Sequence, residues 1–248
     1  MNYSIEIFSR REDLNQSVVE YFIDLARTSI QDHGIFSVAL SGGSTPEPIY
    51  RTLGLPGKKK QLDWKNIHLF WGDERCVPPD HPDSNYRMVK KALLDHIRIP
   101  EENVHRVPAE FEPSMAARSY EAALRDFFKG DYPKFDLVLL GMGDDGHTAS
   151  LFPHSAGLKE EDRWFFENYA PDMDTWRLTL TKNAINAARH IAVLAVGESK
   201  ADMLVEVLEG GFQPDEKPIQ LIEPKNGQMV WFLDQAAAKK LSDQENAK

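Results

Sequence analysis

Four short polar motifs carry the residue types that could bind an anion and move a proton. Each follows an apolar run and contains glycine; they are Ser41–Pro46, Gly72–Arg75, Gly141–His147 and Gly197–Lys200. They bring backbone N–H groups and hydroxyls, an arginine, a lysine and an Asp/His pair. Because open α/β sheets bind ligands at the carboxyl ends of their strands, we expect the motifs to meet in one crevice. This set of groups suits a small phosphorylated molecule undergoing proton transfer.

The first motif is predicted to bind phosphate. Two glycines allow a tight turn and a close approach of the backbone to a ligand. A helix predicted to begin near Pro46, with a hydroxyl cap, would point its free N–H groups and positive dipole end at the same place. The candidate phosphate-binding residues of this motif are Ser41, Gly42, Gly43, Ser44 and Thr45.

Two other interpretations of this motif stay open. The motif also fits an ordinary strand–helix turn without a ligand. It nearly matches the nucleophile elbow of serine hydrolases, with Ser41 as nucleophile. That pattern, Gly-x-Ser-x-Gly, requires glycine at position 39, where this chain has Ala39.

The third motif is predicted to carry the proton-transfer chemistry. Gly141–Gly146 fits G-x-G-x-x-G, but Asp144 and Asp145 would place negative charge beside a dinucleotide pyrophosphate. We expect instead that Asp145 and His147 form a catalytic pair, in which the carboxylate orients the imidazole. A helix expected to begin near Thr148 would disfavour the imidazolium through its dipole and keep the ring neutral. The alternative is a histidine held structurally in a turn.

Four further residues are candidates by type and position. Arg75 offers a planar fork for phosphate or carboxylate oxygens. Lys200 is expected in the first turn of a helix, where the dipole disfavours a cation by about 0.3–1 kcal/mol unless an anion binds nearby. Arg177 precedes a predicted strand and is a weaker phosphate candidate. Asp73 is predicted either to hydrogen-bond sugar hydroxyls or to support the catalytic histidine.

Composition argues against several other classes of protein. The 29 Lys and Arg against 39 Asp and Glu give a net charge of −10, which disfavours a general nucleic-acid surface. The single Cys76 excludes an intrachain disulfide, and we find no spacing typical of a metal site. No apolar run approaches the ~18 residues of a membrane span, and the N-terminus lacks a signal-peptide pattern. We therefore expect a cytoplasmic protein with a small-molecule substrate, no metal and no membrane partner; the oligomeric state is not indicated.

The elements that position the motifs alternate along the chain. Short apolar strands are predicted over 36–40, 67–71, 135–140, 178–181, 190–196 and 229–233. Helices are predicted over 18–30, from 46, over 84–97, from 114, and over 199–210 with Ser199 as cap. Buried strands separated by helices predict a mostly parallel α/β sheet with helices on both faces. We expect a single domain over 1–248, with an irregular segment over about 153–176 and a polar tail over about 242–248.

Taken together, the motifs resemble the 6-phosphogluconolactonases of the glucosamine-6-phosphate isomerase/6-phosphogluconolactonase family. The resemblance spans most of the chain, and its longest motif runs from Gly141 to Pro153. It implies a Rossmann-like fold, hydrolysis of 6-phosphoglucono-1,5-lactone in the oxidative pentose phosphate pathway, and no metal or organic cofactor.

The related glucosamine-6-phosphate deaminases are the main competing prediction. Their Asp-Gly-His motif is followed by a Glu that takes part in proton transfer, and Phe152 occupies that position here. Phenylalanine cannot move the protons that amino-sugar ring opening and isomerisation require. A non-catalytic sugar-phosphate-binding protein is a further alternative, although it would not need Asp145 and His147.

Overall fold

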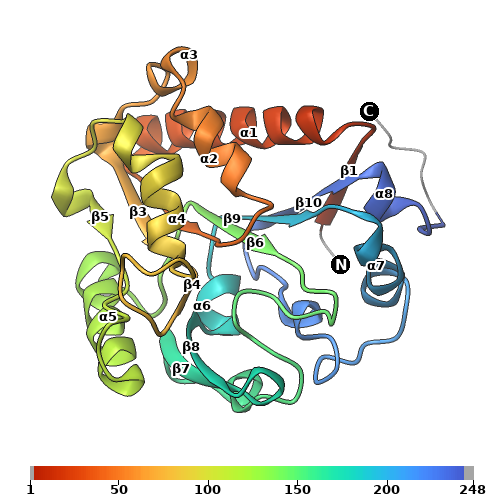
Figure 1. Cartoon of the computed structure of the whole chain (residues 1–248). Helices are drawn as coiled ribbons and strands as arrows, with labels where there is room; N and C mark the ends of the chain where they lie inside the picture. Colours follow the sequence, from red (N-terminus) through yellow and green to blue (C-terminus); the bar gives the residue numbers. More distant parts are fainter. Residues whose placement is uncertain (1–2, 243–248) are drawn as a thin grey trace.

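The computed structural model describes residues 3–242, and its central feature is a seven-stranded sheet (Figure 1). The strands are β1 (Tyr3–Phe8), β2 (Phe36–Leu40), β3 (Ile67–Trp71), β5 (Val104–His105), β6 (Leu137–Gly141), β9 (His190–Ala195) and β10 (Gln228–Asp234). Their order is β1-β10-β9-β6-β2-β3-β5, and every neighbouring pair is parallel.

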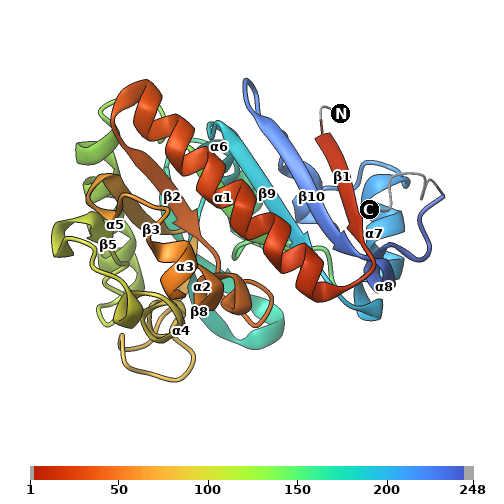
Figure 2. The same cartoon turned by 90° about the horizontal axis from the view of Figure 1, so that it is seen from above.

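Helices lie on both faces of this sheet (Figures 1 and 2). One face carries α1 (Arg11–His33) and α2 (Glu47–Leu53), and the other carries α5 (Pro113–Phe128), α6 (Lys182–Asn186) and α7 (Ala201–Leu208). The other helices are α3 (Pro56–Lys59), α4 (Asn85–Ala92) and α8 (Gln235–Ala238). Short 3-10 turns span Trp64–Asn66, Leu94–His96, Glu101–Asn103, Ala156–Lys159, Pro171–Met173, Glu198–Lys200 and Pro218–Leu221. The predicted mostly parallel α/β fold is confirmed.

The sequence explains why the central strands form where they do. All five residues of β2 are buried, as expected for a strand covered by helices on both faces. In α1, buried side chains recur at helical spacing, among them Leu14, Val18 and Phe22. That helix ends at Gly34, whose φ of 90° suits a left-handed cap.

The order in which the chain adds strands to the sheet reverses between β2 and β6. These strands are neighbours, but β2 leads to β3 on one side and β6 leads to β9 on the other. Such a topological switch point opens a crevice at the carboxyl ends of the two strands. The motifs beginning at Ser41 and Gly141 follow these two strands directly, so the fold brings them together.

A second, three-stranded antiparallel sheet lies beside the first. It contains β4 (Asp73–Arg75), β8 (Thr175–Leu180) and β7 (Phe165–Ala170), in the order β4-β8-β7. The prediction of an irregular segment over 153–176 is wrong for β7. Its polar Glu167 and Asn168 interrupt the apolar pattern, although Asn168 is buried and hydrogen-bonded inside the protein.

The predicted helix near Thr148 does not form. Residues 148–151 make a turn, closed by an isolated bridge between Thr148 and Leu151. Ala149 has a φ of 48°, which an α-helix cannot accommodate, and Pro153 follows shortly after. The helix-dipole argument for a neutral His147 therefore has no structural basis.

Two expected helix caps are also wrong. Helix α2 begins at Glu47 after Pro46, with no side-chain hydrogen bond at its cap. Ser199 does not cap α7, because its hydroxyl donates to Asp144 instead. Apart from Ser242, the predicted polar tail lies outside the described residues, and the single-domain organisation stays a prediction.

Candidate active site

A cleft of about 280 Å³ lies at the topological switch point. It is lined by the loops that follow β2 and β6, by the end of β9, and by residues of β4. All predicted site residues except Asp145 and Arg177 line it: Ser41, Gly42, Gly43, Ser44, Thr45, Asp73, Arg75, His147 and Lys200. The four motifs therefore meet as predicted.

The loop after β2 is held in place by side chains beneath it. The Tyr50 hydroxyl of α2 donates to the Ser41 carbonyl at 2.9 Å and accepts the Ser41 N–H at 3.1 Å. A Cβ on Gly42 would lie 1.8 Å from Asn85 Oδ1, and Gly43 has a φ of 94°, so both positions require glycine. Ser41 Oγ is buried and has no hydrogen-bond partner among residues 3–242.

Asp145 and His147 form the predicted pair. His147 Nδ1 lies 2.6 Å from Asp145 Oδ1, and the same oxygen accepts the His147 backbone N–H at 3.1 Å. This contact places a proton on Nδ1 and leaves Nε2 as the acceptor. Burial raises the pKa of Asp145, but the hydrogen bonds and charge of His147 outweigh it, so that the pKa lies below its ordinary value.

Two neighbours define the position of the His147 ring. The Phe152 ring lies against it, with centroids 4.8 Å apart. A Cβ on Gly143 would lie 2.1 Å from His147 Nδ1, so only glycine leaves room for the imidazole there. The carboxylate and this packing hold the ring in position. The helix terminus that the sequence led us to expect there plays no part.

Arg75 and Arg177 form a pair of cations beside the cleft. They are directly opposite each other in the β4–β8 register. Burial and the charge of Arg75 lower the pKa of Arg177 from its ordinary value. Arg75 also donates to the Asp83 carbonyl at 2.7 Å, which fixes its side chain. Arg177 does not line the cleft.

Lys200 is bound by a residue that the sequence prediction had not assigned to the site. Its Nζ lies 2.6 Å from Asp144 Oδ1. The hydrogen bond and charge of Lys200 lower the pKa of Asp144, although Asp144 is largely exposed. The placement of a cation at the start of α7 is therefore explained by Asp144, without a bound anion.

Asp73 lines the cleft and is hydrogen-bonded to two side chains beside it. It is buried, and its carboxylate accepts the Ser150 hydroxyl at 2.8 Å and the Asn85 amide at 3.3 Å. Among the described residues it makes no hydrogen bond to His147, so the predicted support of the histidine is not seen. Sequence reasoning missed Asn85 and Ser150, because neither lies in a polar run at a strand end.

Two negative findings concern the described part of the chain. Within residues 3–242, no group of three or more His, Cys, Asp or Glu side chains is placed to hold a metal ion. Within the same range, no helix is sufficiently long and apolar to cross a membrane.

The fold and the cleft define an α/β protein with a small-molecule site at the switch point of a parallel sheet. Its hydroxyl, backbone and cationic groups are of the types that bind anions, and its histidine–carboxylate pair is of the type that transfers protons. Comparisons with known proteins identify the family. The family model described as glucosamine-6-phosphate isomerases/6-phosphogluconolactonase matches residues 9–231. The chain belongs to this family.

Individual relatives agree with this assignment. A 6-phosphogluconolactonase of Synechocystis sp. is 44% identical over 86% of this chain and 88% of its own length. A 6-phosphogluconolactonase of Nostoc sp. is 39% identical over 98% of this chain and 100% of its own length. The solved structure of 6-phosphogluconolactonase from Trypanosoma cruzi has a TM-score of 0.84 at 30% identity, and 97% of each chain is covered.

Proposed function

We propose that this chain is an enzyme that hydrolyses 6-phospho-D-glucono-1,5-lactone to 6-phospho-D-gluconate in the oxidative pentose phosphate pathway. The names of its relatives support the substrate. The observation that carries the chemistry is the 2.6 Å contact between Asp145 and His147 beside a cleft with cationic walls. We also propose that the reaction takes place in the cytoplasm, in keeping with the metabolic substrate.

The phosphate is expected to bind among the loop 41–45, Arg75 and Lys200, with Arg177 adding charge. Ser41 Oγ is buried and unpaired in the described residues, and Arg75 is already fixed by Asp83. Binding a remote phosphate fixes the lactone carbonyl near His147 and lowers the entropic cost of attack. To reach Lys200, the phosphate competes with Asp144 for the ammonium group.

In the first step, His147 acts as general base. Its Nε2 takes a proton from water as the water oxygen bonds to C1 of the lactone, and the carbonyl oxygen becomes an oxyanion. Asp145 holds the imidazole in orientation and stabilises the imidazolium. In the second step the C1–O bond of the ring breaks, and His147 returns the proton to the leaving oxygen. No redox or metal step is needed, because attack, proton transfer and ring opening balance by themselves.

The deaminase alternative is disfavoured by Phe152. Its ring packs on His147 and is mostly buried, and it cannot carry a proton. Lactone hydrolysis needs a single base and a water, so an apolar neighbour is compatible with it.

The serine hydrolase alternative lacks a base at Ser41, because its Oγ has no hydrogen-bond partner among the described residues.

The proposal is tested by generating 6-phosphogluconolactone in situ and following its loss with EDTA present. The spontaneous rate is subtracted, and wild type is compared with His147→Ala. We expect fast, EDTA-insensitive loss with wild type alone. If wild type does not accelerate hydrolysis, the lactonase assignment is wrong, and glucosamine 6-phosphate becomes the next substrate to test.

A further inference from the structure

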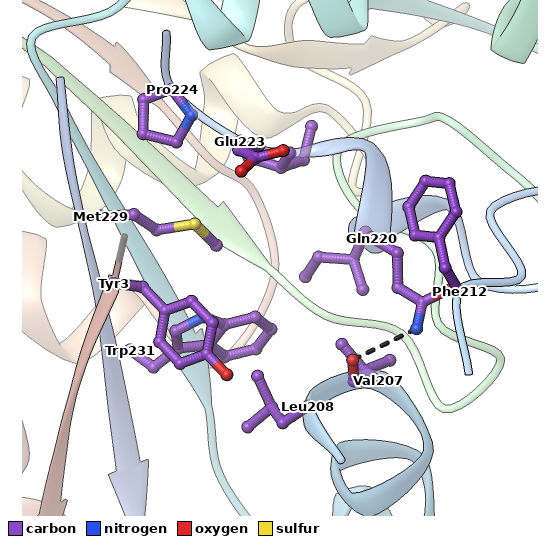
Figure 3. A pocket seen from close by; sticks show the side chains of 11 residues that line it. Tyr3, Val207, Leu208, Phe212, Gln220, Glu223, Pro224, Met229 and Trp231 are labelled. Carbon is purple, nitrogen blue, oxygen red and sulfur yellow. Dashed lines mark hydrogen bonds between the residues drawn. The ribbon is translucent and has the colours of Figure 1, made fainter. Parts of the chain in front are cut away.

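A second cavity, of about 130 Å³, lies away from the candidate active site (Figure 3). It is enclosed by the edge strand β1 and its neighbour β10, the C-terminal end of α7, and the turn that begins at Pro218. Its walls are mainly apolar and aromatic, including Tyr3, Leu208, Ile219 and Trp231. The exposed Phe212 lies at its rim. An apolar cavity of roughly 150 Å³ can hold benzene, so this one is suited to a single ring.

The residues that line the cavity carry only negative charge. Glu223 is the only charged residue among those lining it. The Glu223 carboxylate makes no hydrogen bond or ion pair with any residue in 3–242. Burial and the charge of the nearby Glu209 raise the pKa of Tyr3. Lys225 lies close by in sequence, but its ammonium is over the Tyr132 ring, 5.9 Å from the centroid. The surroundings therefore favour a cation at the mouth of an apolar cavity.

One wall of the cavity is connected to the catalytic loop. The Ile219 N–H donates to the Gly146 carbonyl at 3.0 Å, directly before His147. A Cβ on Gly146 would lie 3.2 Å from Lys217 Cα, so the two backbones are in close contact. The Gln220 amide donates to the Val207 carbonyl at 3.2 Å, which ties the same turn to the end of α7 (Figure 3).

We propose that this cavity binds a small molecule combining one apolar ring with a cationic amine, and that occupancy is coupled to the catalytic loop through Ile219 and Gly146. The ring fills the space between Trp231 and Leu208, and the ammonium pairs with Glu223. A ligand that fixes the turn would also slow opening of the Ile219–Gly146 hydrogen bond, which is coupling through local order. The inference does not rest on the proposed lactonase activity.

Binding is tested with three probes of similar shape, by calorimetry or ligand-observed NMR. They are 2-phenylethylamine, which is a cation, 2-phenylethanol, which is neutral, and phenylacetate, which is an anion. We expect the amine to bind about threefold or more tightly than the alcohol, and the anion to bind weakest. Equal affinity for amine and alcohol would overturn the proposal, because the neutral alcohol can still place its ring in the cavity but cannot pair with the Glu223 carboxylate.

Two variants distinguish binding of the amine at this cavity from a general attraction of cations to an acidic protein. Glu223→Gln is expected to abolish the preference for the amine while the alcohol still binds. Glu101→Gln removes an exposed carboxylate beside β5, at the opposite edge of the sheet, and should keep the preference. Loss of the preference in both variants, or in neither, contradicts the assignment. Leu208→Trp should fill the cavity and exclude all three probes.

The coupling is measured by hydrogen exchange rather than by turnover. With saturating amine, we expect the Ile219 amide and the peptide 141–147 to exchange several-fold more slowly. Leu208→Trp with added amine provides the control for effects unrelated to the cavity. If the amine binds and exchange at both places is unchanged, the coupling is refuted.

Discussion

A single oxygen, Oδ1 of Asp145, holds His147 at two points: the ring Nδ1 at 2.6 Å and the backbone N–H at 3.1 Å. The carboxylate thereby fixes both the orientation of the ring and the turn that carries it. Asp145→Asn can keep the shape of the turn but presents an amide that cannot stabilise an imidazolium in the same way. We expect its kcat to fall by roughly 10²-fold or more with KM little changed. For His147→Ala we expect kcat to fall by about 10²–10⁴-fold. Near-normal turnover of either variant would refute the general-base role.

The space around the histidine gives a second prediction, with a matched control. A methyl group at Gly143 would lie 2.1 Å from His147 Nδ1, whereas one at Gly57, in α3 and outside the cleft, would meet nothing within 4 Å. We expect Gly143→Ala to displace the ring and lower kcat at least tenfold, and Gly57→Ala to stay within about twofold of wild type. Circular dichroism and urea unfolding establish that both variants are folded. Equal effects of the two substitutions on kcat would show that Gly143 is not needed for the position of the His147 ring.

The ion pair between Lys200 and Asp144 predicts opposite effects of two substitutions. Lys200→Ala removes a cation from the phosphate site and should raise KM about tenfold or more, with a smaller effect on kcat. Asp144→Asn removes the carboxylate that competes with the substrate phosphate and should lower KM by roughly twofold to fivefold. Steady-state kinetics at low ionic strength makes the contrast largest. A higher KM in Asp144→Asn would mean instead that Asp144 positions Lys200 for the substrate.

The parallel core of the fold was predictable from sequence because its strands are buried on both faces. Runs such as 36–40 are continuously apolar, and the polar motifs after them mark their ends. By contrast, β1 alternates apolar residues with Ser4 and Glu6, and β5 has only two residues, so neither produces a recognisable run. The strand predicted over 178–181 forms as β8, but it belongs to the second sheet, which was not predicted because β4 consists of Asp73–Arg75 and looks like part of a loop.

The site was predictable to the extent that each residue type implies one chemistry. The pairing of Asp145 with His147 follows from their spacing of two, and the structure confirms the contact. The helix expected after His147 was wrong, because Ala149 adopts a left-handed conformation that its residue type does not announce. Asp144 was misjudged because its partner, Lys200, lies far away in sequence. Such contacts depend on the packing of β6 against β9, which a local pattern does not contain.

Two stacked histidines away from the site predict how stability depends on pH. His68 Nδ1 and His105 Nε2 are 3.2 Å apart, and the His105 ring stacks on Phe70 with centroids 4.1 Å apart. Burial, followed by the charge of His68, lowers the pKa of His105 to about 4 from an ordinary 6.5, and burial also lowers the pKa of His68. The folded state therefore resists protonation of both rings.

Between pH 6.5 and about 4 the unfolded chain binds protons that the folded chain excludes, so the free energy of unfolding must fall as the pH falls through this window. Urea unfolding at pH 7, 6 and 5 measures that slope. His105→Gln should flatten it, whatever its effect on stability at pH 7, because it removes the ring with the lower pKa. His81→Gln replaces a solvent-accessible histidine and should keep the wild-type slope. The account fails if His105→Gln loses stability on acidification as steeply as wild type, since protonation of this ring would then contribute nothing to the pH dependence.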